Sequence, residues 1–209
     1  MSDRDHIAAA SMEAVQVGLL GGAFDPPHIG HIALAEAAAR HFSVARLLVV
    51  VTGEAPHKGV PTPAEARYEL AEVAFGGRPG IEVSQRELGR PGPSYTVDTV
   101  RWAAERFGEV VFIVGADEFA SFLNWHRPNA ILEAARLGVA TRAGYQRGVL
   151  DSVRSRLALP ERVEFFVIPA IRVSSSQVRE RVARGTAIDD LVPPAVAERI
   201  AARGLYRDP

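Results

Sequence analysis

Two histidines, His28 and His31, lie three residues apart in a stretch with phosphate-binding chemistry, Gly21-Gly22-Ala23-Phe24-Asp25-Pro26-Pro27-His28-Ile29-Gly30-His31. The stretch follows a predicted strand and opens a predicted helix, whose first N–H groups can bind an anion. At a helix start this spacing places both imidazoles on one face. Two imidazoles there can donate hydrogen bonds to phosphoryl oxygens, most effectively as charge builds up in a transition state. Gly30 keeps a blocking side chain away from that phosphate.

A second group with phosphate-binding chemistry lies roughly 150 residues further along, at Ser175, Ser176 and Arg179. It also follows a predicted strand and opens a helix, so hydroxyls and a guanidinium could clamp a polyphosphate. Simpler interpretations stay open for both groups. Serines cap helices, and two histidines at this spacing are often surface residues. A zinc site is disfavoured because no third ligand lies near the histidines.

Apolar runs alternate with segments of helical periodicity along most of the chain. Predicted strands cover residues 15–20, 47–51, 81–84, 110–114, 137–140 and 163–168. Predicted helices cover residues 29–42, 63–74, 97–107, 118–122, 175–184 and 195–202. Such alternation implies right-handed crossovers and parallel strands. We therefore predict a Rossmann-like, doubly wound α/β fold with a mostly parallel sheet, flanking helices and a small C-terminal helical subregion.

The expected organisation is one domain over residues 15–209, preceded by an N-terminal tail over residues 1–14. Within that domain, residues 165–209 carry the second phosphate-binding group and the closing helices. Ligands of open parallel sheets bind at the carboxyl ends of the strands, near the topological switch point. Both phosphate-binding groups follow a predicted strand, so we expect the site at that edge.

Composition excludes several classes of protein. The 209 residues are 47% hydrophobic and 23% charged, which is typical of a globular protein. With 24 basic and 25 acidic side chains the net charge is −1, which argues against a protein that coats nucleic acid. The chain has no cysteine, so disulfides, thiolate nucleophiles and sulfur-based zinc sites are excluded. No long apolar segment suggests a signal peptide or a membrane span, so we expect a cytoplasmic, soluble protein.

The first histidine stretch resembles the GxFxPxHxGH signature of the nucleotidylyltransferase superfamily. The second group, Val173-Ser174-Ser175-Ser176-Gln177-Val178-Arg179, resembles its other motif, ISSTxIR. This resemblance implies transfer of a nucleotide from a nucleoside triphosphate, with Mg²⁺ and pyrophosphate release. His28 and His31 would stabilise the transition state at the α-phosphate, and Ser175, Ser176 and Arg179 would hold the departing phosphates. The implied ATP site comprises Gly22, Ala23, Phe24, His28, His31, Gly115, Asp117, Arg142, Ser175, Ser176 and Arg179. Ala23 replaces a common threonine, so one hydroxyl contact is lost.

Further stretches resemble the nicotinate mononucleotide adenylyltransferase family, and the likeness extends from Val17 to the closing Gly204-Leu205-Tyr206. In Pro56-His57-Lys58, the resemblance implies that His57 and Lys58 hold the acceptor's 5′-phosphate. In Ser94-Tyr95-Thr96, it implies that Tyr95 and Thr96 meet a pyridine carboxylate.

Asp117, at the end of a predicted strand, would accept hydrogen bonds from a ribose hydroxyl. Trp125 would stack on the pyridine ring. The simpler interpretations are an exposed basic loop at residues 56–58, a helix cap by Ser94 or Thr96, and a core role for Trp125.

The implied reaction is direct attack by the phosphate of nicotinate mononucleotide on the α-phosphorus of ATP. Lys58 would position the attacking phosphate, which is already ionised near neutral pH and needs no general base. Catalysis would then come from positioning and charge stabilisation. Mg²⁺ would be held mainly by ATP phosphates and water. Open alternatives are nicotinamide mononucleotide or phosphopantetheine as acceptor, a non-catalytic nucleotide-sensing module, and a homo-oligomeric state; no nucleic acid or membrane partner is expected.

Overall fold

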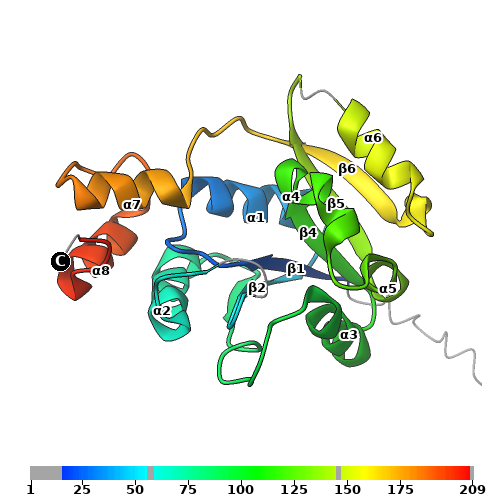
Figure 1. Cartoon of the computed structure of the whole chain (residues 1–209), viewed down its shortest axis with the longest axis horizontal. Coiled ribbons are helices and arrows are strands. Elements are labelled where there is room, and N and C mark those ends of the chain that lie inside the picture. Colours follow the sequence, from blue (N-terminus) through cyan, green and yellow to red (C-terminus); the bar gives the residue numbers. More distant parts are fainter. Residues whose placement is uncertain (1–15, 56–58, 145–146, 208–209) are drawn as a thin grey trace, which may run out of the picture.

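A computed structural model describes residues 16–55, 59–144 and 147–207. Its centre is one six-stranded sheet in the order β3-β2-β1-β4-β5-β6 (Figure 1). The strands are β1 (Val17–Gly22), β2 (Arg46–Val51), β3 (Ile81–Ser84), β4 (Val110–Gly115), β5 (Arg136–Arg142) and β6 (Val163–Ile168). All neighbouring strands pair in parallel, so the predicted fold class is confirmed and the sheet is parallel throughout.

Helices cover both faces of the sheet, as a doubly wound fold requires (Figure 1). One face packs against α1 (Ile29–His41), α2 (Ala64–Phe75), α7 (Ser175–Ala183) and α8 (Pro194–Arg203). The other packs against α3 (Thr96–Phe107), α4 (Ala116–Ala120), α5 (Pro128–Ala134) and α6 (Gly148–Ser155). Two short 3-10 turns, η1 (Phe122–Asn124) and η2 (Pro160–Arg162), complete the elements.

The sequence of β2 is apolar from Leu47 to Val51 because both faces of that stretch are buried. Its side chains alternate between the two faces: Leu47, Val49 and Val51 join the core under α1 and α2, while Leu48 and Val50 join the core under α3. Because both faces are covered by helices, the strand reads as a continuous Leu and Val run.

The position of β1 explains where the site lies. It is hydrogen-bonded to β2 on one side and β4 on the other, so the strand order reverses direction beside it. The connections from these strands leave a crevice at their carboxyl ends, where ligands of this fold class bind. The first histidine stretch follows β1 directly and therefore lies at that switch point.

The predicted helix over residues 118–122 was misplaced, and two helices were missed. The chain forms α4 at Ala116–Ala120 and then the separate turn η1, because the helix starts directly at the end of β4. Helices α5 and α6 have seven and eight residues, too short to show a clear helical period. Among the described residues, no helix has the length and apolarity needed to cross a membrane.

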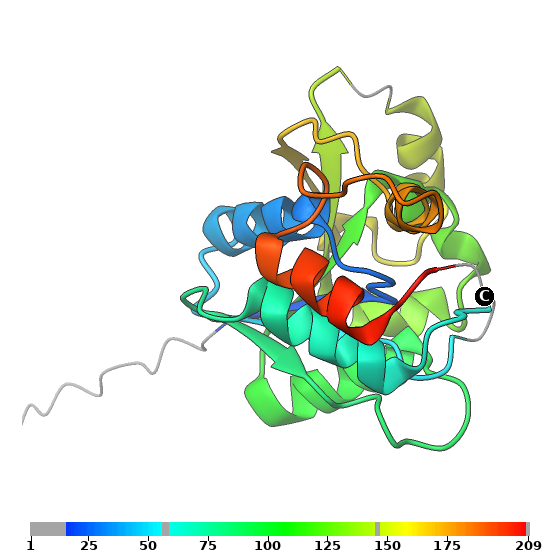
Figure 2. The ribbon, with the colours of Figure 1, turned by 90° about the vertical axis from the view of Figure 1, so that its left-hand side faces the viewer.

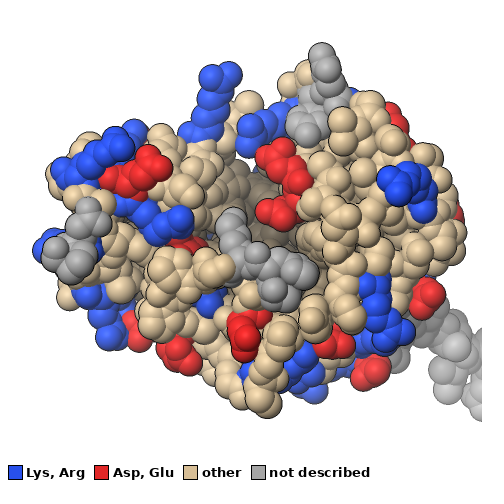
Figure 3. Space-filling model, in the orientation of Figure 1, with Lys and Arg blue, Asp and Glu red and all other residues tan. Residues whose placement is uncertain are grey.

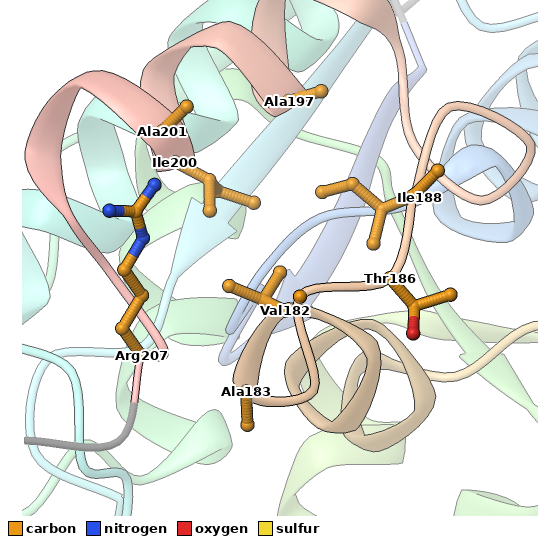
Figure 4. Close-up of a pocket in the computed structure, with 10 residues that line it drawn as sticks. Val182, Ala183, Thr186, Ile188, Ala197, Ile200, Ala201 and Arg207 are labelled. Carbon is orange, nitrogen blue, oxygen red and sulfur yellow. The ribbon is translucent and has the colours of Figure 1, made fainter.

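The C-terminal helices α7 and α8 form a layer beside α1 and α2. Figure 2 shows α8 along α2, where Arg199 and Arg203 form ion pairs with Glu69. A pocket of about 590 Å³ separates the end of α7 from α8 (Figure 4). The pocket is lined by mostly apolar side chains, with Arg207 at its edge (Figure 4). Its lining includes no residue of either phosphate motif, so this pocket is separate from the predicted site.

Candidate active site

The two histidines hydrogen-bond to each other at the start of α1. His28 is the N-cap residue, and its Nδ1 accepts a hydrogen bond from the His31 backbone N–H at 3.3 Å. In return, the Nδ1 of His31 accepts from the His28 N–H at 3.2 Å, which makes a reciprocal capping box. The two rings stack with their centroids 3.7 Å apart. The prediction that both imidazoles share one face is confirmed.

This capping arrangement determines which ring nitrogen carries the proton. A backbone N–H can only donate, so each Nδ1 must be unprotonated, and in a neutral ring the proton lies on Nε2. Burial lowers the pKa of His28 to about 4. Burial, with a smaller contribution from His28, holds the pKa of His31 well below its usual range. Near neutral pH the turn therefore presents two neutral Nε2–H donors.

Phe24 and Gly30 determine how the two histidine rings pack. The Phe24 ring is buried and meets the His31 ring edge-on, with 5.0 Å between centroids. The Phe24 ring is therefore a packing group, and only the backbone of this residue remains for the predicted contact with ATP. A Cβ on Gly30 would come within 3.0 Å of Val173 and 3.1 Å of the His28 ring. Gly30 is thus needed because the side chains of Val173 and His28 approach it closely. This reason differs from the predicted one, which was to leave space for a phosphate.

The second phosphate motif packs directly on the first. Ser174 caps α7 by accepting from the Gln177 N–H. The Ser175 hydroxyl donates to the Pro26 carbonyl at 2.8 Å, and Arg179 donates to the Asp25 carbonyl at 2.6 Å.

Arg179 also donates to the Ser176 hydroxyl at 3.2 Å. The structure therefore brings the predicted residues of both motifs together at one end of the sheet.

A buried arginine that sequence reasoning missed holds the turn after β1. Arg67, on α2, is 1% exposed and donates to the carbonyls of Ala23, Gly53 and Thr62. Burial lowers the pKa of Arg67, and the charge of Asp25 partly offsets this effect. A signal was available in the sequence, because positions 67, 70, 71 and 74 fall on one face of a helix and the last three are apolar.

The missed residue Tyr206 contacts the same turn from the C-terminal end. Its hydroxyl donates to Asp25 Oδ1 at 2.7 Å, across 181 residues of sequence. Asp25 itself is only 4% exposed. The Asp25 side chain therefore has a structural partner far outside the histidine motif.

Two predicted acceptor residues, Tyr95 and Trp125, pack against the core on the face of the sheet opposite α1 and α7. Tyr95 is the N-cap residue of α3 and forms no side-chain cap, so the simpler interpretation of a cap by Ser94 or Thr96 is wrong. The Tyr95 ring stacks on His126, with centroids 4.2 Å apart. Sequence reasoning missed His126, which carries no motif signal of its own.

Trp125 has a core contact and an accessible surface. Its ring packs against Phe122 and Phe112, with centroid distances of 5.2 and 6.1 Å. The residue is nevertheless only half-buried, so part of its surface is accessible. Thr96 begins α3 and is likewise partly exposed.

The remaining predicted residues lie at the ends of β4 and β5. Gly115 ends β4 and caps α4, Asp117 is exposed in the first turn of α4, and Arg142 is exposed at the end of β5. Figure 3 shows a hollow on this face, with acidic side chains beside α4 and basic ones beside α7. The predicted acceptor residues His57 and Lys58 lie outside the described residues.

These features define a class of protein: a parallel α/β fold whose first turn packs against a late helix at the carboxyl end of the sheet. A family model described as cytidylyltransferase-like matches residues 19–181. The chain thus belongs to this family of nucleotidyltransferases.

Similar proteins identify the family within the nucleotidyltransferases to which the chain belongs. A Moorella thermoacetica protein is 39% identical, with 92% of each chain covered. A Thermus thermophilus protein is 40% identical, with 92% of this chain and 100% of that protein covered. Both are named "Probable nicotinate-nucleotide adenylyltransferase". The chain belongs to the nicotinate-nucleotide adenylyltransferase family.

Solved structures share the fold. The Plasmodium falciparum nicotinic acid mononucleotide adenylyltransferase complexed with NaAD superposes with a TM-score of 0.73 at 16% identity. The match covers 91% of this chain and 97% of that one. The same enzyme complexed with APC gives a TM-score of 0.71 at 15% identity, covering 91% and 96%. At these identities the likeness confirms the fold alone.

Proposed function

We propose that this protein transfers AMP from ATP to nicotinate mononucleotide, giving nicotinate adenine dinucleotide and pyrophosphate. The observation that carries the proposal is the direct contact between the two phosphate motifs. Ser175 and Arg179 hydrogen-bond to the turn that presents His28 and His31. The names and coverage of the relatives support the choice of acceptor.

In the proposed reaction, an oxygen of the acceptor phosphate attacks the α-phosphorus of ATP. A new bond forms between that oxygen and the α-phosphorus, while the bond from the α-phosphorus to the bridging oxygen breaks. Pyrophosphate leaves with that bridging oxygen and its electron pair. The acceptor phosphate is already ionised near neutral pH, so the protein's task is positioning and charge stabilisation.

On the ATP side, the Nε2–H groups of His28 and His31 donate to the α-phosphate oxygens. Because both rings are neutral and capped at Nδ1, they act as oriented dipoles rather than as acids. Such fixed donors need no reorganisation as charge develops.

The N-terminus of α7 binds the leaving pyrophosphate. Ser175 and Ser176 face the β- and γ-phosphates, and Arg179 braces the pyrophosphate. The backbone of Gly22, Ala23 and Phe24 lines the turn next to the nucleotide.

At the ends of β4 and β5, Gly115 lies against the nucleotide, Asp117 accepts from a ribose hydroxyl, and Arg142 adds positive charge near the phosphates.

On the acceptor side, Tyr95 and Thr96 bind the pyridine carboxylate, an anion at the N-terminus of α3. The accessible part of the Trp125 ring stacks on the pyridine. His57 and Lys58 hold the 5′-phosphate.

The proposed reaction also requires Mg²⁺, which would bind the ATP phosphates. The described residues contain no cluster of three metal-ligating side chains. A hard cation that retains water and phosphate ligands fits such surroundings. The ion neutralises charge on the phosphates when bound. Since ATP is a cytoplasmic substrate, we propose the cytoplasm as the location of the reaction.

The test is pyrophosphate release with ATP and Mg²⁺, comparing nicotinate mononucleotide, nicotinamide mononucleotide and phosphopantetheine. We expect a strong preference for the nicotinate form. The double variant His28→Ala/His31→Ala serves as the control, because any release it retains comes from a contaminating enzyme. Preference for another acceptor would overturn the acceptor assignment. ATP binding without release by the folded protein would favour a nucleotide-sensing role.

Lys58 allows a sharper test of the acceptor side, because it is the only lysine in the sequence. An amine-reactive reagent can therefore modify only Lys58 and the chain's N-terminal amine. We expect nicotinate mononucleotide to protect Lys58 from modification, whereas ATP alone protects it less. Equal modification with and without the acceptor would remove Lys58 from the site.

A further inference from the structure

The C-terminal part of the chain fixes the turn between β1 and α1. The Tyr206 hydroxyl donates to the Asp25 carboxylate at 2.7 Å. The amide of Ile29, one of the first N–H groups of α1, donates to the Leu191 carbonyl at 3.0 Å. Helix α7 adds its own contacts to the carbonyls of Asp25 and Pro26. The turn that carries both histidines is therefore held by residues from the other end of the sequence.

The Tyr206–Asp25 contact is partly buried. Asp25 is 4% exposed, so loss of the Tyr206 hydroxyl would leave a buried carboxylate oxygen without that hydrogen bond. Burial, with a contribution from Asp25, raises the pKa of Tyr206 far above its usual range. The hydroxyl therefore stays protonated and remains a donor throughout the working pH range.

Tyr206 and Arg179 reach the turn from different helices. A pocket lies between the end of α7 and α8 (Figure 4). Helix α8 is instead tied to α2, through the ion pairs of Arg199 and Arg203 with Glu69. Tyr206 lies just beyond α8 and thus reaches Asp25 from a different support than Arg179 does.

The backbone around Asp25 needs such external support. Its neighbour Phe24 adopts a φ of 49°, a left-handed conformation that is unfavourable for a side chain of this size. The carbonyl of Ala23 is held by Arg67, and the carbonyl of Asp25 by Arg179. Among the described residues, the side-chain hydrogen bond to the Asp25 carboxylate comes from Tyr206, at 2.7 Å.

We propose that Tyr206 and Asp25 form a positioning pair, which fixes the β1–α1 turn in the conformation that directs His28 and His31 toward the transferred phosphate. Neither residue touches the reacting atoms. The activity test of this pair rests on the proposed function. The geometry of the histidine rings can be measured without any substrate, so the two proposals can fail separately.

Three variants separate positioning from stability. Tyr206→Phe removes only the hydroxyl. Asp25→Asn removes the charge and keeps an oxygen that can accept from Tyr206. Arg203→Gln is the matched control, because it breaks a contact between α8 and α2 without touching the turn.

The measurements are kcat and KM well below the unfolding temperature, with ring ¹⁵N shifts of His28 and His31 in the ligand-free protein. We expect Tyr206→Phe to lower kcat roughly tenfold, the scale of one hydrogen bond to a charged group. The acceptor KM should change less than kcat. The ring signals of both histidines should move, and Asp25→Asn should lose less activity than Tyr206→Phe. Arg203→Gln should match the wild type in both readouts.

Equal kcat values for Tyr206→Phe and Arg203→Gln would overturn the proposal, as would unchanged ring signals in Tyr206→Phe. If Tyr206→Phe does not fold, Asp25→Ala, which removes the acceptor of the same hydrogen bond, decides through the same ring signals. Absence of pyrophosphate release by the wild type would contradict the proposed function, and the ring signals would still decide whether the pair positions the turn.

Discussion

The two sides of the site are held by different kinds of interaction. On the phosphate side, Ser175 and Arg179 hydrogen-bond to the carbonyls of Pro26 and Asp25, across 149 and 154 residues of sequence. On the acceptor side, the aromatic side chains contact one another, with Tyr95 stacked on His126 and Trp125 packed on Phe122, while the backbone N–H of Ser94 donates to the Glu54 carbonyl. The phosphate-side side chains are therefore held by directional bonds, and the aromatic side chains of the acceptor side by ring contacts.

This difference matches what each side has to do. Hydrogen bonds demand narrow distances and angles, so they hold donors where charge will develop on a transferred phosphoryl group. Aromatic contacts tolerate offset and tilted arrangements, so they can adjust around a flat ring. We therefore expect changes on the phosphate side to lower turnover or stability, and changes on the acceptor side to weaken acceptor binding.

The largest expected effect comes from His31→Ala. Loss of its Nε2–H donor should lower kcat by roughly 10² to 10³-fold, as for removal of one oxyanion donor. Steady-state pyrophosphate release measures this. His31→Gln, whose amide can place an N–H near the same position, should retain more activity. Near-normal turnover of a folded His31→Ala protein would break the assignment of the phosphate side.

The second effect is a pH dependence of stability due to His28. An unfolded imidazole binds its proton below about pH 6.5, whereas folded His28 does so only near 4. The unfolded state therefore binds more protons between these values, and stability falls as the pH drops from 6.5 to 4. The expected loss is about 3 kcal/mol for His28, and His31 shifts in the same direction.

Urea unfolding at several pH values measures this loss. His28→Asn is the control, because asparagine also caps helices but does not titrate. The difference in unfolding free energy between the two proteins should shrink as the pH falls through this window. A difference that stays constant with pH would show that His28 does not keep its low pKa in the folded protein.

The third effect tests the acceptor side through Trp125. Trp125→Leu keeps an apolar side chain against Phe112 and Phe122 but removes the stacking surface. We expect the acceptor KM to rise about two- to tenfold, with a smaller change in the ATP KM, because ring stacking contributes about 0.5–1.5 kcal/mol. Steady-state kinetics with each substrate varied in turn measures both constants.

Trp125 also provides a direct binding signal. The sequence has two tryptophans, so Trp102→Phe leaves Trp125 as the single fluorophore. Its fluorescence should change on addition of nicotinate mononucleotide. An unchanged signal together with an unchanged KM in Trp125→Leu would mean that Trp125 is only a core residue.

The sequence predicted the parts of the site whose signals are local. His28 and His31 belong to one turn, and Ser175 and Arg179 to one helix start, so each group can be recognised without knowing the fold. The alternation of strands and helices then predicted that both groups lie at the same edge of the sheet. That edge follows from parallel pairing, which the structure confirms.

The missed residues act through partners that leave no local pattern. Arg67 binds three backbone carbonyls, and a carbonyl is present at every position of the chain. Tyr206 and Asp25 are 181 residues apart in the sequence and meet only in the folded chain. The cap of α3 was wrong for a related reason, since Tyr95 starts that helix without any side-chain hydrogen bond.

The smallest expected effect concerns His126 and sharpens the comparison between the two sides. His126 is exposed, and its contact with Tyr95 joins the turn before α3 to the turn before α5. His126→Ala should raise the acceptor KM about two- to threefold, near the lower end of aromatic pair energies, and leave the ATP KM unchanged. His126→Phe, which keeps a ring over Tyr95, should restore the wild-type acceptor KM. If His126→Phe instead behaves like His126→Ala, the imidazole acts through polar contacts, and the acceptor side is held by directional bonds as the phosphate side is.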